Sequence, residues 1–271
     1  MVADLTLEFN LPSQPMVFTA PSRRGAFREV SRAAADFLRM KTSRSDSRKL
    51  SHIGQGRRVM VVPGFGAGDG YTRWLRDHLE QIGFQTEGWG LGKNTAGKGL
   101  TGAVDFFDVP NEMLNRPELE VCLLAMKLRE HVKARAAETG EKYILIGHSL
   151  GGYLSREVAR QLPESVDQLI TMGSPVYGGP KYTAGAPLYT RRGVDLDWIE
   201  AQIAEREKLA IKVPITTIVS PTDAIVDYQA SIDRGQPHAR LIEIDVSHYG
   251  MAFNQQVWEQ LFQTLALSAK T

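Results

Sequence analysis

The sequence predicts an α/β protein with a mostly parallel sheet and helices on both faces of that sheet. From residue 57 onward, short apolar runs of strand length alternate with longer segments of helical periodicity. The apolar runs, such as YILIG at 143–147, are continuous rather than alternating, which is typical of strands buried on both faces. Residues 57–271 are therefore expected to form the main domain, after an N-terminal extension at 1–56.

The expected elements follow one another in a regular order along the main domain. Strands are expected at 57–62, 84–89, 143–147, 166–173, 215–220 and 240–247, and helices at 69–83, 117–140, 150–162 and 253–267. Pro117 near the start of one helix and Gly140 past its end are typical helix boundaries. Residues 175–213 interrupt the alternation with loop residues and one charged helix. We expect a lid-like insertion there, over the carboxyl ends of the strands, where such sheets bind ligands.

The N-terminal extension is strongly basic. Residues 23–58 hold eleven Lys or Arg against three acidic residues, a net charge of +8, although the whole chain has a net charge of only +1. Phe27, Val30, Phe37 and Leu38 recur at helical spacing and predict a basic amphipathic helix that packs on the main domain by this apolar stripe. Peripheral contact of residues 23–58 with an anionic membrane is the alternative.

Other features of the sequence exclude some classes of function. Residues 1–22, which include the alternating LTLEFNL at 5–11, are expected to form an edge strand. No recognised nucleic-acid-binding motif accompanies the basic segment. The single Cys122 leaves no intramolecular disulfide, and no apolar run approaches the roughly 20 residues of a membrane span. We expect a soluble cytoplasmic protein. Because no His, Cys and carboxylate cluster has metal-binding spacing, we expect no metal and no other cofactor.

The pattern G-x-S-x-G at 147–151 places Ser149 between a buried strand and a helix. A loop that is merely rich in small residues is the simplest explanation of such a pattern. Because the strand precedes it without a gap and a helix follows at once, it instead predicts a sharp turn that raises a nucleophilic serine above the sheet. The amide of Leu150, at the helix N-terminus, would then face the oxygen of a substrate carbonyl.

A nucleophilic serine needs a base, and the base needs an orienting carboxylate. His248 follows the last predicted strand and precedes the closing helix, as a base carried on a loop should, and His238 is the alternative. Asp223 directly leaves the preceding strand and is the favoured acid. Asp227 is better explained as a helix cap, and Asp245, inside the last predicted strand, is a weaker candidate.

The loop after the first strand, VVPGFGAGDG at 61–70, is expected to supply a second donor to the same substrate oxygen. The amide of Phe65 is the candidate donor, and its side chain is expected to contact substrate. Trp89, at the end of the strand FQTEGW, is expected near the acyl-binding pocket.

Six segments together resemble the α/β-hydrolase superfamily, and among its members the bacterial esterases and lipases: VMVVPGFGAGD, GWGLGKN, LIGHSLGG, TMGSPVYGG, SPTDAIV and DVSHYGM. The resemblance covers about residues 57–271. It implies the α/β-hydrolase fold, with Ser149 as nucleophile, His248 as base and Asp223 as orienting acid. It also implies an oxyanion hole formed by the amides of Phe65 and Leu150.

The chain departs from the pattern of many esterases at one place. Those enzymes carry His-Gly before the oxyanion residue, whereas this chain has Pro63-Gly64. In related lipases, a single glycine followed by a bulky residue usually accompanies medium or long acyl chains. The resemblance therefore implies a lipophilic substrate.

These observations predict a serine carboxylic-ester hydrolase that cleaves small-molecule or lipid esters through an acyl-enzyme on Ser149. An acyltransferase or thioesterase with the same catalytic residues is the first alternative, because only the acyl acceptor or the leaving group would differ. A non-catalytic, hydrolase-like domain that binds a membrane or a partner through its basic arm is the second alternative.

Overall fold

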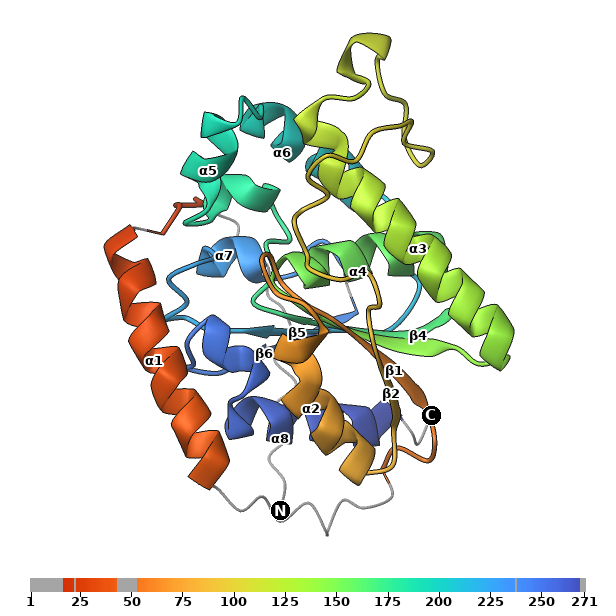
Figure 1. Ribbon diagram of the computed structural model, residues 1–271, viewed down its shortest axis with the longest axis vertical. Helices are drawn as coiled ribbons and strands as arrows, with labels where there is room; N and C mark the ends of the chain where they lie inside the picture. Colours follow the sequence, from red (N-terminus) through yellow and green to blue (C-terminus); the bar gives the residue numbers. More distant parts are fainter. Residues whose placement is uncertain (1–16, 22, 43–52, 237, 269–271) are drawn as a thin grey trace.

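The computed structural model describes residues 17–21, 23–42, 53–236 and 238–268, so the strand predicted at 5–11 lies outside the described residues. Within them, one sheet of six strands has the order β2-β1-β3-β4-β5-β6, and every neighbouring pair is parallel (Figure 1). The strands are β1 Arg58–Val62, β2 Gln85–Gly88, β3 Tyr143–His148, β4 Val166–Met172, β5 Ile215–Val219 and β6 Ala239–Glu243. The predicted α/β fold is confirmed. The strand predicted at 240–247 ends at Glu243, so the residues after it already belong to the loop that leads to His248.

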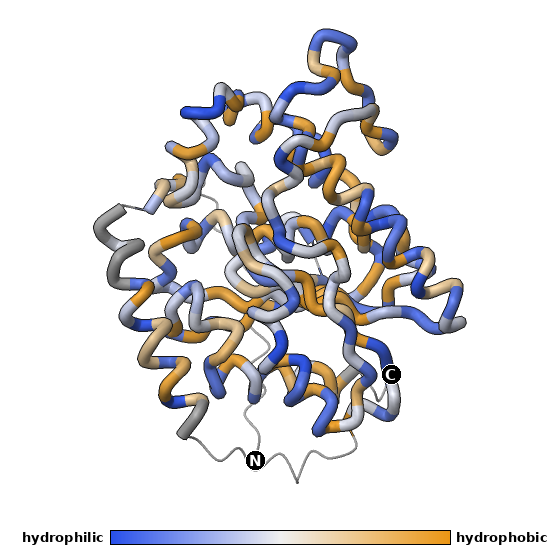
Figure 2. Tube along the Cα trace, viewed as in Figure 1, coloured by the Kyte–Doolittle hydropathy of each residue, from blue (hydrophilic) through white to orange (hydrophobic). Residues whose placement is uncertain are grey.

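Helices cover both faces of the sheet (Figure 1). One face packs against α2 (Asp69–Gln81) and α8 (Gln255–Ser268), and the other packs against α3 (Glu120–Thr139) and α4 (Leu150–Gln161). Successive residues of a strand point to opposite faces, so Val59 and Val61 join the first core while Met60 and Val62 join the second. Figure 2 shows the hydrophobic residues concentrated along the strands between the two layers of helices. Burial on both faces explains the continuous apolar runs in the sequence.

The strand order reverses direction between β1 and β3. The chain runs from β1 to β2 on one side, and β3 returns on the other side of β1. In open parallel sheets the carboxyl ends of the strands at such a point diverge and leave a crevice for ligands. The segments that follow these two strands are the glycine-rich loop with Phe65 and the turn with Ser149.

The insertion at 175–213 contains the turn η4 (Gly179–Tyr182) and the helices α5 (Ala186–Arg191) and α6 (Leu196–Glu207), beyond one end of the sheet (Figure 1). The sequence predicted only the charged helix, α6, because η4 and α5 are too short to show helical periodicity. Arg206 of α6 forms an ion pair with the buried Glu157 of α4 at 2.6 Å. This pair ties the insertion to the body of the domain. The remaining elements are η2 (Asn111–Met113), η3 (Pro117–Leu119), α7 (Tyr228–Ser231) and η5 (Tyr249–Ala252).

Helix α1 (Arg23–Thr42) lies along one side of the domain and packs against η5 (Figure 1). A helix was predicted there, but the predicted apolar docking face was wrong, since Val30 and Leu38 are 62% and 63% exposed. The buried face carries two acidic residues, Glu29 and Asp36, together with Met40. Phe37 packs at the edge of the core, whereas the side chain of Phe27 lies outside the described residues. Apolar periodicity did not predict the buried face of α1, because the two buried carboxylates dock through hydrogen bonds to loops of the main domain. Among the described helices, none has both the length and the apolarity needed to cross a bilayer.

Candidate active site

Ser149 lies on a strained turn between β3 and α4. Its backbone angles are φ 53° and ψ −125°, a conformation that costs a residue with a side chain on the order of 1–3 kcal/mol. The turn requires glycine on both sides. A Cβ atom at Gly147 would lie 2.4 Å from the Cα of Gly152, and one at Gly151 would lie 2.3 Å from the carbonyl oxygen of Val62. The structure therefore has the sharp strand-to-helix turn that the G-x-S-x-G pattern predicted.

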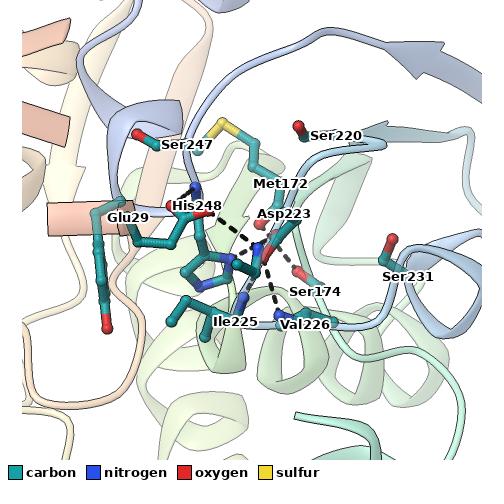
Figure 3. Close-up of polar contacts among 12 residues, drawn as sticks. Glu29, Met172, Ser174, Ser220, Asp223, Ile225, Val226, Ser231, Ser247 and His248 are labelled. Atoms are coloured by element: carbon teal, nitrogen blue, oxygen red, sulfur yellow. Dashed lines mark hydrogen bonds and ion pairs between the residues drawn. The ribbon is translucent and has the colours of Figure 1, made fainter. Parts of the chain in front are cut away.

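Asp223 and His248 form a buried hydrogen-bonded pair (Figure 3). The Nδ1 atom of His248 donates to Oδ2 of Asp223 over 2.7 Å, and the two side chains are 2% and 3% exposed. The other carboxylate oxygen of Asp223 accepts from the amides of Ile225 at 2.8 Å and Val226 at 2.9 Å. Because Nδ1 carries the proton of this bond, the Nε2 atom of the neutral imidazole has a free lone pair that can accept another proton.

The alternative acid and base candidates lie in other environments. His238 is exposed and immediately precedes β6. Asp227 is the N-cap of α7 and accepts from the amide of Ala230 at 2.9 Å, and Asp245 is an exposed partner of Arg32. The structure thus brings together Asp223 and His248 and places the other three candidates apart from this pair.

The loop after β1 is held beside Ser149 by Asn94, a fully buried residue that the sequence analysis missed. The Asn94 side chain donates to the carbonyl of Pro63 at 2.8 Å, and its backbone exchanges hydrogen bonds of 2.7 Å with Gly66 and Ala67. The signal in the sequence was Asn94 at the end of GLGKN, since an asparagine side chain among glycines can hydrogen-bond to the backbone of another loop.

Both predicted oxyanion donors lie near Ser149. Phe65 and Leu150 line the same cavity as Ser149, and a Cβ atom at Gly64 would lie only 3.0 Å from the Cβ of Ser149. Within the described part of the chain, the amides of Phe65 and Leu150 have no hydrogen-bond partner. Leu150 begins α4, so its free amide also lies at the positive end of a helix dipole. The arrangement suits a bound oxygen that carries partial negative charge.

A cavity of about 690 Å³ extends from this site toward the insertion. This size is typical of small-molecule binding pockets. Ser149, His248 and Phe65 line one part of it, and apolar residues of the insertion line another, including Leu188, Tyr189, Trp198, Ile199 and Ile203. The cavity therefore combines a few polar groups at one end with a largely apolar wall.

Trp89 does not lie at this cavity, contrary to the prediction. Its side chain is fully buried in the core with Met60 and Leu128, and its ring N–H donates to the carbonyl of Gly92 at 2.8 Å. Asp69 of α2 accepts from the Trp89 amide at 2.9 Å and so fixes the backbone after β2 where the ring packs in the core.

Hydrogen bonds from His148, next to the serine turn, and from Tyr71 also hold the backbone of the loop that carries His248. The Nε2 atom of His148 donates to the carbonyl oxygen of His248 at 2.9 Å. The hydroxyl of Tyr71 donates to the backbone carbonyl oxygen of Tyr249 at 2.8 Å. Burial, reinforced by the nearby His248, lowers the pKa of His148 to about 3. His148 is therefore neutral near pH 7 and acts here as a hydrogen-bond donor.

Comparisons with solved structures show the same fold in other proteins. A soluble variant of monoglyceride lipase from Saccharomyces cerevisiae, in complex with a substrate analog, has a TM-score of 0.54 at 17% identity, over 79% of this chain and 87% of that chain. The monoacylglycerol lipase of Paleococcus ferrophilus has a TM-score of 0.52 at 15% identity, over 79% and 96%. An alpha/beta superfamily hydrolase from Oenococcus oeni PSU-1 has a TM-score of 0.52 at 13% identity, over 80% and 94%.

The comparison with curated proteins gives no match. Among protein families, residues 121–259 match the PGAP1-like alpha/beta domain. The matched region is just over half of the chain, and it runs from the start of α3 to α8, through the serine turn and the Asp223–His248 pair. The chain therefore belongs to the PGAP1-like alpha/beta domain family and is a member of the α/β-hydrolase superfamily.

Proposed function

We propose that this protein is a serine hydrolase that cleaves carboxylic esters of lipophilic acids through an acyl-enzyme on Ser149. The observation that carries the proposal is that Ser149 and His248 line one largely apolar cavity. Ser149 has strained backbone angles, and His248 is hydrogen-bonded to the buried Asp223. The similar structures described as lipases of monoglycerides support the same substrate class.

The reaction proposed for this site has two stages. The Oγ atom of Ser149 attacks the ester carbonyl while Nε2 of His248 takes its proton, and the amides of Phe65 and Leu150 donate to the oxyanion. The protonated His248 then gives this proton to the leaving alcohol, which breaks the ester bond and leaves an acyl group on Ser149. Water then attacks the acyl-enzyme while His248 takes one of its protons. His248 returns that proton to Oγ of Ser149 as the ester bond breaks, which releases the acid and restores the serine. Asp223 holds the imidazole and stabilises its cationic form.

The cavity leads us to propose an acyl chain of medium length or longer. Its apolar wall belongs mainly to the insertion, next to Ser149. Each buried methylene group of a substrate contributes about 0.8 kcal/mol, so kcat/KM should rise with acyl length until the cavity is filled. A series of p-nitrophenyl esters of increasing length measures this dependence. A rate that falls from acetate to octanoate would contradict the lipophilic specificity and leave the reaction class intact.

A fluorophosphonate probe tests the reaction class directly, because it labels only an activated serine. We expect stoichiometric labelling of the full chain, located at Ser149 by peptide mass analysis, and none in Ser149→Ala. Ser165→Ala, in the turn before β4, is the matched control and should be labelled like the wild type. An unlabelled wild-type protein would refute the proposal. Product analysis with added alcohols then separates hydrolysis from acyl transfer.

A further inference from the structure

A carboxylate from helix α1 lies beside the Asp223–His248 pair (Figure 3). One oxygen of Glu29 accepts from the backbone amide of His248 at 2.6 Å, and the other accepts from the amide of Ala224 at 3.0 Å. Ala224 directly follows Asp223 in the chain. A single side chain thus joins the loop that carries the acid to the loop that carries the base. Glu29 lies far outside the segments that resemble hydrolases, and nothing in its sequence context indicates this contact.

The environment of Glu29 is unusual for a glutamate. Its side chain is almost fully buried, with 1% of the residue exposed. Burial raises the pKa of Glu29, the nearby Asp223 raises it further, and the amides of Ala224 and His248 and the His248 imidazole lower it in part. Burying a carboxylate is costly unless hydrogen bonds compensate it, and the two amides provide charge-assisted bonds of this kind. Because a buried carboxylate without hydrogen bonds would destabilise the fold, the burial of Glu29 depends on these two amides.

Two other residues of α1 bind the same loops from the same helix face. Arg32 donates to the carbonyl and the hydroxyl of Thr222, the residue before Asp223, at 3.2 and 2.9 Å. Asp36 accepts from the hydroxyl of Ser247, the residue before His248, at 3.0 Å. Residues 29, 32 and 36 follow helical spacing, so one face of α1 contacts both loops. The helix is therefore placed to set the distance between them.

We propose that Glu29 is a positioning residue for the hydrolysis proposed above, on which this inference rests. Its carboxylate fixes the positions of the loop that carries Asp223 and the loop that carries His248 relative to each other. The 2.7 Å bond between Asp223 and His248 then forms without rearrangement of either loop. Its negative charge also stabilises the imidazolium that His248 becomes during the reaction. Helix α1 is thus part of the reactive centre, because it supplies the Glu29 carboxylate from outside residues 57–271.

The charge of Glu29 gives the proposal a readout that a purely structural role lacks. The titratable groups that interact with this carboxylate are Asp223, His248 and Tyr249 on the loops. Arg32 and Asp36 lie along α1 and bind Asp245 and Ser247 instead. Removing the negative charge makes protonation of His248 less favourable. The acidic limb of the kcat/KM profile should therefore move to lower pH in a variant that keeps the shape of Glu29 and loses its charge.

Glu29→Gln is the variant that tests the proposal in the full chain. The amide is isosteric, but it offers one acceptor where two amides donate. We expect kcat to fall about 10- to 100-fold with KM changed far less, since small displacements of a catalytic group have effects of this size. We also expect the acidic limb to move to lower pH and the rate of fluorophosphonate labelling to fall with kcat.

Two further variants separate positioning from stability. Glu29→Asp keeps the charge and shortens the side chain, so it should lower kcat but leave the acidic limb in place. Asp36→Asn weakens the docking of the same helix without touching His248, so it should lower the melting temperature and also leave the limb in place. If a folded Glu29→Gln protein has the kcat and pH profile of the wild type, the inference is wrong. Wild-type protein labelled at Ser149 in that same experiment would leave the proposed function standing, whereas unlabelled wild-type protein would refute both.

Discussion

The imidazole of His248 donates to the carboxylate of Asp223 over 2.7 Å, and two backbone amides hold the other oxygen of that carboxylate. Asp223 is thereby fixed in orientation before any substrate binds. An acid held in this way orients the base in the correct tautomer and stabilises its cationic form, whereas a neutral amide at the same place favours the wrong tautomer and cannot stabilise the cation.

We therefore predict that Asp223→Asn lowers kcat by about 10²- to 10⁴-fold, because the amide favours the wrong imidazole tautomer. Asp227→Asn is the control, since Asp227 caps α7 and does not contact His248. Asparagine caps a helix about as well as aspartate, so this variant should keep its stability and most of its activity. Steady-state kinetics of the two variants on one ester decide the matter. Greater loss of activity in Asp227→Asn would assign the acid to that residue.

Ser149→Ala should lower ester hydrolysis by a factor on the order of 10³ to 10⁶. His248→Ala should lose nearly as much, and the double variant should lose little more, because the two residues act in one step. The measurement is kcat for the single and double variants, with circular dichroism to check folding. Multiplied losses in the double variant would show that the residues act independently. Full activity in His248→Ala with inactive His238→Ala would assign the base to His238.

His148 should make the protein less stable in acid. Its pKa is about 3 in the folded protein and about 6.5 in the unfolded chain, so between these values only the unfolded chain takes up the proton. Its contribution to stability is complete above about pH 6.5 and is lost as pH falls toward 3. His148→Gln keeps a donor for the His248 carbonyl and removes this titration.

The free energy of unfolding of the wild type, relative to His148→Gln, should therefore fall by about 1.4 kcal/mol per pH unit between pH 6 and pH 4. Urea unfolding of both proteins at several pH values measures this difference. A difference that stays constant over that range would mean that the pKa of His148 is the same in the folded protein and in the unfolded chain.

Removal of residues 1–50 should lower both the melting temperature and the activity. The deletion uncovers the edge of the core that Phe37 and Met40 cover, and burial of such side chains is worth about 1.5–3 kcal/mol each. It also removes Glu29, Arg32 and Asp36 from the loops that carry Asp223 and His248. The measurements are thermal unfolding and ester hydrolysis of both forms.

The alternative for this segment is a membrane arm, and Val30 and Leu38 do point away from the domain. In that case the truncated form would keep its melting temperature and activity, and only the full chain would bind anionic vesicles. Such binding would weaken as salt rises, because surface charges are screened within about 8–10 Å at physiological ionic strength. This combination of results would replace the docked helix with a membrane arm.

Local sequence was enough to predict the parallel sheet, the serine turn and the residues that form the Asp223–His248 pair. The reason is that each depends on a short stretch of chain. A turn at Ser149 needs small residues within two positions of it. A parallel sheet brings the carboxyl ends of its strands to one edge, and Asp223 follows β5 and His248 follows β6 at that edge. The two partners of this hydrogen bond could therefore be chosen by chain order before any distance was known.

The positions of Trp89 and Asn94 and the buried face of α1 were decided by tertiary structure. Trp89 lies in the core because Asp69 of another element, α2, binds its amide and fixes its backbone there. Glu29 is buried because amides of two distant loops, at positions 224 and 248, point toward the same place on α1. Hydrophobic periodicity measures only how a helix would meet an apolar surface. A helix that docks through buried carboxylates depends on where unpaired amides lie in space, and that information exists only in the folded chain.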